Sequence, residues 1–187
     1  MDKQVEIDHK ICVHIQKLAR DAEKTSASNF AVAQRWGRWN GGLGLGVVIL
    51  SASVSALGAA SASKSVVAEP DLQSQLILLS TIISSVAAVL GSILTFLKPS
   101  ELAAHYREFG NKQKALCNRL RVYHTVSIAF TADPDQRHNA LRDFLTEKDA
   151  LNSDNPEIPR WAFTQASKDI AAKPQQQANE ESARTES

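Results

Sequence analysis

The chain has 187 residues, a length that fits one domain. Its 43% hydrophobic and 22% charged residues are ordinary for a globular protein, and a formal net charge of +1 argues against a nucleic-acid-binding protein, which usually carries a clustered basic face. The charges are unevenly placed, however. No Asp, Glu, Lys or Arg occurs between Arg38 and Lys64, or between Asp71 and Lys98.

The N-terminal segment, residues 1–40, is polar and periodic. Its apolar residues recur at intervals of three and four, which predicts an amphipathic helix, at Ile7, Ile11, Ile15, Leu18 and Ala22. A long polar segment ahead of the first apolar run is unlike a cleavable signal peptide. We therefore expect the apolar run to be retained as an anchor.

The first uncharged stretch, residues 41–63, is predicted to be a transmembrane helix. As a helix it rises about 35 Å, enough to cross a hydrocarbon core about 30 Å thick. Gly, Ser and Ala fill much of it, so its insertion alone is marginal. The second stretch, residues 72–97, is richer in Leu, Ile and Val and can insert alone. We expect the two helices to insert as a packed pair.

The connection at residues 64–71 is short, and Pro70 within it cannot continue the first helix. Eight residues force an antiparallel hairpin. Basic residues lie mostly outside this hairpin, at Arg35, Arg38, Lys98, Arg107, Lys112 and Lys114. The positive-inside rule then places both termini in the cytoplasm and the connection outside. Trp36 and Trp39 flank the first span, where indole rings settle at headgroup depth.

The alternative is a pair of buried helices in a soluble bundle. The chain offers few other apolar segments to bury two such helices, which disfavours this alternative.

After the second span, residues 98–172 predict a cytoplasmic helical region. Apolar residues alternate by four and three in a narrow seam typical of helix pairing: Leu102, Tyr106, Phe109, Leu116, Leu120 and Tyr123, with Gln113 in register. The seam can pair with the N-terminal helix of the same chain or with another subunit. The hairpin brings the two flanks together and so favours pairing within the chain. Pro134 marks the start of a further helix, a last short helix follows Pro159, and the composition of residues 173–187 predicts a disordered tail.

Small residues line both spans at helical spacing. They form two small-residue faces, Gly42, Gly46, Ser51, Ser55 and Gly58 in the first span and Thr81, Ser84, Ala88, Ser92 and Thr95 in the second. One interpretation is close helix packing, because small residues let backbones approach in lipid. The other is a hydroxyl-lined pore formed on oligomerisation. Both interpretations stay open.

Neither span holds a charged residue, which argues against an ion-coupled transporter. No catalytic constellation and no Cys/His cluster with metal-ligand spacing is present, so we expect no enzyme activity, no metal and no cofactor. Cys12 and Cys117 lie in segments placed in the cytoplasm, which favours free thiols over a disulfide.

Four sequence features together resemble the SLATT family, the SMODS- and SLOG-associating two-transmembrane effector domain. They are FAVAQRWGRW at residues 30–39, the Gly/Ser/Ala-rich first span, FLKP at residues 96–99 followed by ELAAHYREFGNKQKALCNRLR, and LRDFLTEKDALNSDNPEIPRWAFTQA at residues 141–166. The resemblance covers approximately residues 5–172. It implies a bacterial inner-membrane effector of anti-phage or conflict systems that forms pores or disrupts the membrane when a sensor is triggered. Such sensors make or bind nucleotide second messengers, or are other defence enzymes.

The sequence thus predicts an all-α membrane protein with a two-helix transmembrane hairpin and long amphipathic cytoplasmic helices on both sides. The expected function is a membrane-permeabilising effector, and the alternative is a non-conducting anchor or scaffold that recruits a partner through its cytoplasmic helices. The expected partners are the lipid bilayer, further copies of the chain, and a separate sensor or nucleotide-signalling enzyme, because the chain shows no sensor domain. No nucleic acid partner is expected.

Overall fold

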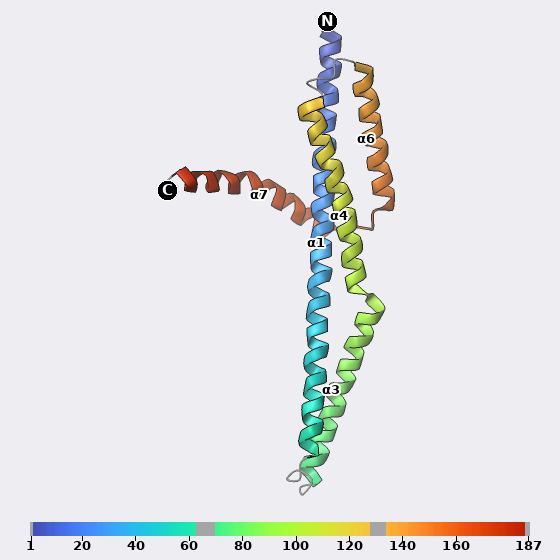
Figure 1. Ribbon diagram of the computed structural model, residues 1–187, viewed down its shortest axis with the longest axis vertical. Coiled ribbons are helices and arrows are strands. Elements are labelled where there is room, and N and C mark those ends of the chain that lie inside the picture. Colours follow the sequence, from blue (N-terminus) through green and yellow to red (C-terminus); the bar gives the residue numbers. More distant parts are fainter. Residues whose placement is uncertain (1, 63–69, 128–133, 186–187) are drawn as a thin grey trace. The chain divides into compact units, whose positions relative to one another are not determined.

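The computed structural model describes residues 2–62, 70–127 and 134–185. These residues form the helices α1 (Asp2–Ser61), α3 (Pro70–Leu97), α4 (Pro99–Val122), α6 (Pro134–Asp154) and α7 (Arg160–Thr185), with a π-helical turn η1 (Tyr123–Ser127) after α4 (Figure 1). The described residues contain no strand, so the all-helical class is confirmed. The predicted connection at residues 64–71 lies largely outside them.

The chain divides into two compact units. One, which we call the bundle, combines Met1–Ala33 with Ala104–Ser187; the other, the apolar unit, is Gln34–Ala103. Helix α1 contributes to both units and has no break between the predicted polar segment and the first predicted span. Each unit is described by itself below.

The bundle is built on the pairing of α1 with α4. Four of the five predicted apolar positions on α1 are buried, namely Ile11, Ile15, Leu18 and Ala22, and the side chain of Ile7 lies outside the described residues. They share one core with Leu116, Cys117 and Leu120 of α4. Because apolar residues three and four apart lie on one helix face, each helix presents a continuous stripe to the other.

Helix α6 packs on the same core through partly buried side chains. Leu141, Phe144 and Leu151 contact it, and the ring of Phe144 meets that of Tyr123 edge-on with centroids 5.5 Å apart. Lys148 forms an ion pair with Asp21 of α1 at 3.0 Å. The predicted start at Pro134 is confirmed, since proline is well placed at the first position of a helix, where its missing N–H costs nothing.

Helices α1 and α4 approach each other closely at Gly110. The Ser26 hydroxyl donates to the Gly110 carbonyl oxygen at 2.8 Å. A Cβ atom at position 110 would lie 3.2 Å from two ring carbons of Phe30, tighter than ordinary van der Waals contact. A side chain at position 110 would therefore require the Phe30 ring to shift by a few tenths of an ångström.

Helix α7 differs from its prediction in length. It follows the predicted break at residues 155–159, and its first turns bury Ala162 and Ala166. Its backbone stays helical to Thr185, whereas the composition predicts a disordered tail from residue 173. Ala, Gln and Glu, which are frequent in this segment, have good helix propensity.

The apolar unit contains the second half of α1 with α3, which lie side by side in Figure 1. Helix α3 begins at Pro70, two residues before the predicted span, with Asp71 in its first turn, where a carboxylate favours the positive end of the helix dipole. It ends at Leu97, as predicted. Lys98 follows with a φ of 44°, a left-handed conformation rare outside glycine, and its N–H donates to the Leu94 carbonyl oxygen.

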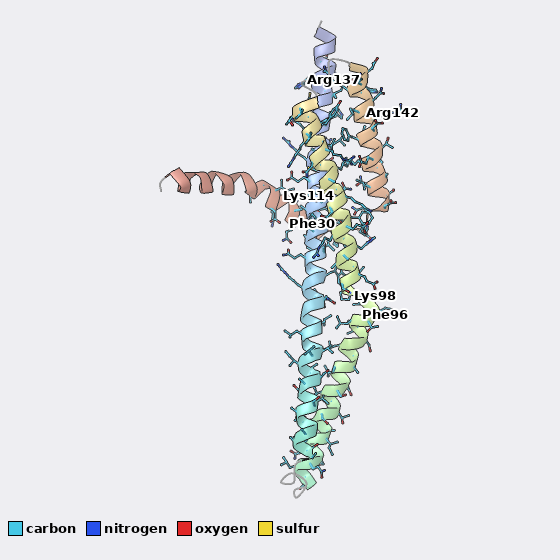
Figure 2. The ribbon with its side chains drawn as sticks, in the orientation of Figure 1. Phe30, Phe96, Lys98, Lys114, Arg137 and Arg142 are labelled. Atoms are coloured by element: carbon cyan, nitrogen blue, oxygen red, sulfur yellow. The ribbon has the colours of Figure 1, made fainter. Side chains whose placement is uncertain are left out.

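The break at Lys98 is explained by Pro99, the first residue of α4, because the residue before a proline is disfavoured in the helical region. Phe96, beside the break, is 88% exposed (Figure 2).

Among the described residues, two helices are long and apolar enough to cross a membrane. In each, no residue of the most apolar stretch is buried within the structure. A core helix of a soluble protein has a similar composition but is mostly buried, so the exposure of these stretches argues against the soluble-bundle alternative. We regard the second half of α1 and α3 as candidate transmembrane helices.

Candidate membrane-facing site

The two candidate transmembrane helices meet along a seam of half-buried residues, mostly Leu, Val and Ile with a few small residues between them. The half-buried positions on α3 recur at three and four residues: Leu76, Ser80, Ile83, Ala87, Leu90 and Leu94. Those on α1 show the same spacing at Leu43, Val47, Leu50, Val54 and Leu57. A Cβ added at Gly46 would lie 3.9 Å from Leu90 Cδ1, which places these two residues at the contact.

The two predicted small-residue faces do not form this seam. Nine of the ten residues are exposed, and only Gly46 is half-buried against α3. A Cβ added at Gly42 or Gly58 would meet no other atom within 4 Å. Within one chain, therefore, the small residues do not bring the two helices together, and their faces point outward from the apolar unit.

Most hydroxyl groups on these faces are bonded to their own helix. Ser55 donates to the Ser51 carbonyl oxygen at 3.1 Å, Thr81 to that of Ile77 at 2.8 Å, Ser92 to that of Ala88 at 2.8 Å and Thr95 to that of Gly91 at 2.9 Å. Such bonds to the preceding turn satisfy the donor without a second helix. The hydroxyl oxygens keep lone pairs that can accept hydrogen bonds from water.

A wide hollow lies along the C-terminal half of α3. Its volume is about 1140 Å³, and it includes three residues of the predicted face, Ala88, Ser92 and Thr95. It also includes Gly91, which the sequence did not single out, and Phe96, which the sequence analysis gave only as part of FLKP. The signal for Phe96 was the FLKP break, because the end of α3 exposes the side chain just before it.

The predicted seam of α4 is largely covered by the chain itself. Phe109, Leu116 and Leu120 are buried, as is Gln113, and Leu102, Tyr106 and Tyr123 are half-buried. Leu116 and Leu120 belong to the core shared with α1. Of the two pairings considered for this seam, the structure contains the one within the chain.

Burial and neighbouring charges shift the pKa of three side chains in the bundle. Burial raises the pKa of Tyr106, and the nearby Glu157 carboxylate raises it further, while the phenol donates to the Glu157 carbonyl oxygen at 2.8 Å. Burial likewise raises the pKa of Tyr123, against the opposing charge of Arg137. The hydrogen bond and charge of Lys112 lower the pKa of Glu108. Cys12 and Cys117 are not joined in a disulfide.

Among the described residues, no three His, Cys, Asp or Glu side chains are grouped so as to hold a metal ion. No family model, curated protein or solved structure in the comparisons matches the chain. The SLATT resemblance therefore stays a prediction. What the structure shows, over the residues that it describes, is an all-helical protein with two candidate transmembrane helices.

Proposed function

We propose that the chain crosses the membrane twice as an antiparallel hairpin, with both termini in the cytoplasm of a bacterial cell. Support comes from the exposed apolar surface of the second half of α1 and of α3. Arg35, Arg38 and Lys98 are exposed just outside the apolar stretches, where they match the positive-inside rule. Peptide tags at either terminus are then protected in intact spheroplasts, whereas a cysteine at position 67 is labelled from outside. A tag that is labelled in intact spheroplasts contradicts this orientation.

We further propose that the protein is a membrane-permeabilising effector that acts as an oligomer. The observation that carries this proposal is the outward position of the small-residue faces, because Ser51, Ser55, Ser84 and Ser92 do not pack the hairpin. Two helices cannot enclose a lumen, so a pore requires several copies. In lipid, small residues mark the surfaces where helices of different chains approach closely.

The trigger is proposed to come from a separate sensor, as the resemblance to the SLATT family implies. The bundle is the part of the chain available to such a partner, because it is folded on its own apolar core. A change in that core alters how α1 and α4 pair, and each of these helices continues into the apolar unit.

A non-conducting anchor or scaffold is the second candidate. It is favoured by the hydroxyl bonds within each helix, since donors that are already satisfied tolerate contact with lipid. The absence of charge in both spans also fits a passive anchor.

The deciding experiment compares two sets of substitutions at Ser51, Ser55, Ser84 and Ser92. In the effector, changing them to Leu closes and dewets the lumen, so cells expressing triggered wild type depolarise and cells expressing the Leu variants do not, at equal membrane abundance. Changing the same serines to Ala removes the hydroxyls but keeps close packing possible. Abundant Ala variants that conduct less indicate a polar lumen.

Two other outcomes would contradict a conducting pore. If the Leu changes lower abundance and the Ala changes have no effect, the serines only pack helices of neighbouring copies. Abundant wild-type oligomers that never depolarise cells, even with the natural sensor active, contradict the effector and leave the scaffold.

A further inference from the structure

A separate hollow in the bundle has the composition of a ligand site. It lies between α1 and α4 and has a volume of about 260 Å³. Its apolar floor is made by Ile15, Ala19 and Leu120, all of them buried. Its polar wall consists of Gln16, Arg20, Arg121, His124 and Thr125. No aspartate or glutamate lines it.

The two arginines come from different helices and are differently engaged. Arg121 of α4 forms an ion pair with Glu23 at 2.7 Å, and Glu23 lines a neighbouring hollow instead of this one. Arg20 of α1 is exposed and forms no ion pair with any residue that the structure describes. Glu23 thus holds Arg121 at the hollow, and Arg20 adds a positive charge with no acidic partner in that part of the chain.

The π-helical turn η1 contributes the remaining wall. It follows directly after α4 and carries His124 and Thr125. The Gln16 amide nitrogen lies 2.9 Å from His124 Nε2, so this contact joins α1 to the turn across the hollow. The Thr125 hydroxyl donates to the Arg121 carbonyl oxygen at 2.9 Å. Single π turns are rare and occur frequently at functional sites.

We propose that this hollow binds the phosphate group of an anionic ligand. Arginine offers planar, paired N–H donors that match phosphate oxygens, and the two arginines supply more donors than the Glu23 carboxylate can accept. The apolar floor lowers the local dielectric and strengthens each contact. Small-molecule pockets measure about 300–1,000 Å³, so this hollow takes a phosphate or diphosphate group and leaves the rest of a larger ligand outside.

The ligand is either a dissolved phosphate compound or a lipid headgroup with a terminal phosphate, since the recognition chemistry is the same. The proposal does not rest on permeabilisation, because the residues of the hollow belong to the bundle and none lies in the small-residue faces.

The test uses the full-length protein in a neutral detergent and measures binding of inorganic pyrophosphate by isothermal titration calorimetry. Arg20→Gln is expected to weaken binding at least tenfold, and Arg20→Lys less. The matched control is Arg107→Gln, which removes an exposed arginine of α4 that does not line the hollow, and its affinity is expected to equal that of wild type. Circular dichroism checks that each variant keeps the helical content of the wild type.

A second arm places the protein in nanodiscs of phosphatidylcholine with or without phosphatidic acid. Competition of phosphatidic acid with pyrophosphate, lost in Arg20→Gln, identifies a headgroup as the source; pyrophosphate binding without competition identifies a dissolved ligand. Equal weakening by Arg20→Gln and Arg107→Gln means attraction by general charge and overturns the proposal. Absence of binding in both arms, or equal affinity for glutamate and pyrophosphate, also overturns it.

Discussion

The bundle and the apolar unit use the same residue types in opposite ways. In the bundle, Ile15, Leu116 and Leu120 are at most 1% exposed. In the apolar unit, Val48, Leu78 and Val89 are each more than half exposed, although they are equally apolar. The first arrangement is that of a protein folded in water, where the burial of apolar surface is the main source of stability. The second arrangement, which extends over the apolar stretches of both helices, fits surroundings that are themselves apolar.

The two units also differ in the residues that fill the contact between their helices. Narrow apolar stripes with polar flanks join α1 to α4 in the bundle, and Phe30 lies against the backbone at Gly110. In the apolar unit the seam is mostly Leu, Val and Ile, and nine of the ten predicted small-residue positions are left on the outside. The bundle therefore has its single glycine at a helix contact, whereas in the apolar unit most of the predicted small-residue positions form free surface.

The largest expected effect comes from truncating a core side chain. Leu116→Ala removes a fully buried side chain and is expected to lower the free energy of unfolding of the bundle by roughly 2–5 kcal/mol. Leu78 of the apolar unit is 64% exposed. Leu78→Ala is therefore expected to have almost no effect on the free energy of unfolding of the bundle. Urea unfolding in detergent, followed by circular dichroism, measures both. Equal losses would remove the distinction between the two units.

A smaller effect is expected from filling the close approach at Gly110. Gly110→Ala gains helix propensity but pushes a methyl group against Phe30, so the bundle is expected to lose about 1 kcal/mol net. Gly42→Ala, whose new methyl group meets nothing within 4 Å, leaves bundle unfolding unchanged. Adding Phe30→Leu to Gly110→Ala makes room for the methyl group and restores part of the loss. No difference between the two glycine variants would argue against the contact.

The free energy of unfolding of the bundle is expected to depend on pH through Tyr106. Tyr106→Phe removes the hydrogen bond to the Glu157 carbonyl oxygen and is expected to cost about 0.5–1.5 kcal/mol near neutral pH. Because burial raises the folded-state pKa of Tyr106, its contribution is complete below the unfolded pKa of about 10 and is lost as the pH rises through the folded value. Tyr123 also titrates, so the measurement is the difference in unfolding free energy between wild type and variant from pH 8 to 11. A difference that stays constant over this range contradicts the shift.

The smallest expected effect concerns ion pairs. The Lys148–Asp21 pair joins α6 to α1 at 3.0 Å, with Lys148 mostly covered. A double-mutant cycle with Lys148→Met and Asp21→Asn is expected to give a coupling of about 0.2–1 kcal/mol that weakens in salt. The exposed Lys10–Glu6 pair within α1 serves as the control and is expected to give less. A larger coupling for the control would show that burial does not strengthen the first pair.

Much of the fold follows from local patterns in the sequence. The stripe from Ile11 to Ala22, the end of α3 before Pro99 and the start of α6 at Pro134 were predicted, because apolar period and proline geometry act over a few residues. The contact of Gly110 with Phe30 was not, since it depends on the register between α1 and α4. The π-helical turn was also missed, because one extra residue in a turn leaves the apolar period almost unchanged.

Only part of the candidate site was predicted, because local spacing does not determine which helix faces meet. Helical spacing placed the small residues on common faces, but it could not tell whether those faces look at the partner helix or away from it. That depends on which side of α1 meets α3, and the structure places Leu90 and its neighbours there. The basic hollow combines Arg20 with Arg121, which are a hundred residues apart in sequence, so no local pattern indicates it.

The central claim is that the exposed apolar surface of the apolar unit lies in lipid and that of the bundle in water. The direct measurement is labelling by a water-soluble maleimide in open membrane fragments, with Cys12 and Cys117 replaced by alanine. Single cysteines replace four exposed apolar residues: Val13 and Leu145 in the bundle, 48% and 41% exposed, and Val48 and Ile82 in the apolar unit, 65% and 54% exposed. The account predicts fast labelling at 13 and 145, and labelling at 48 and 82 only after the membrane is dissolved. Equal rates at all four positions in intact fragments would contradict it.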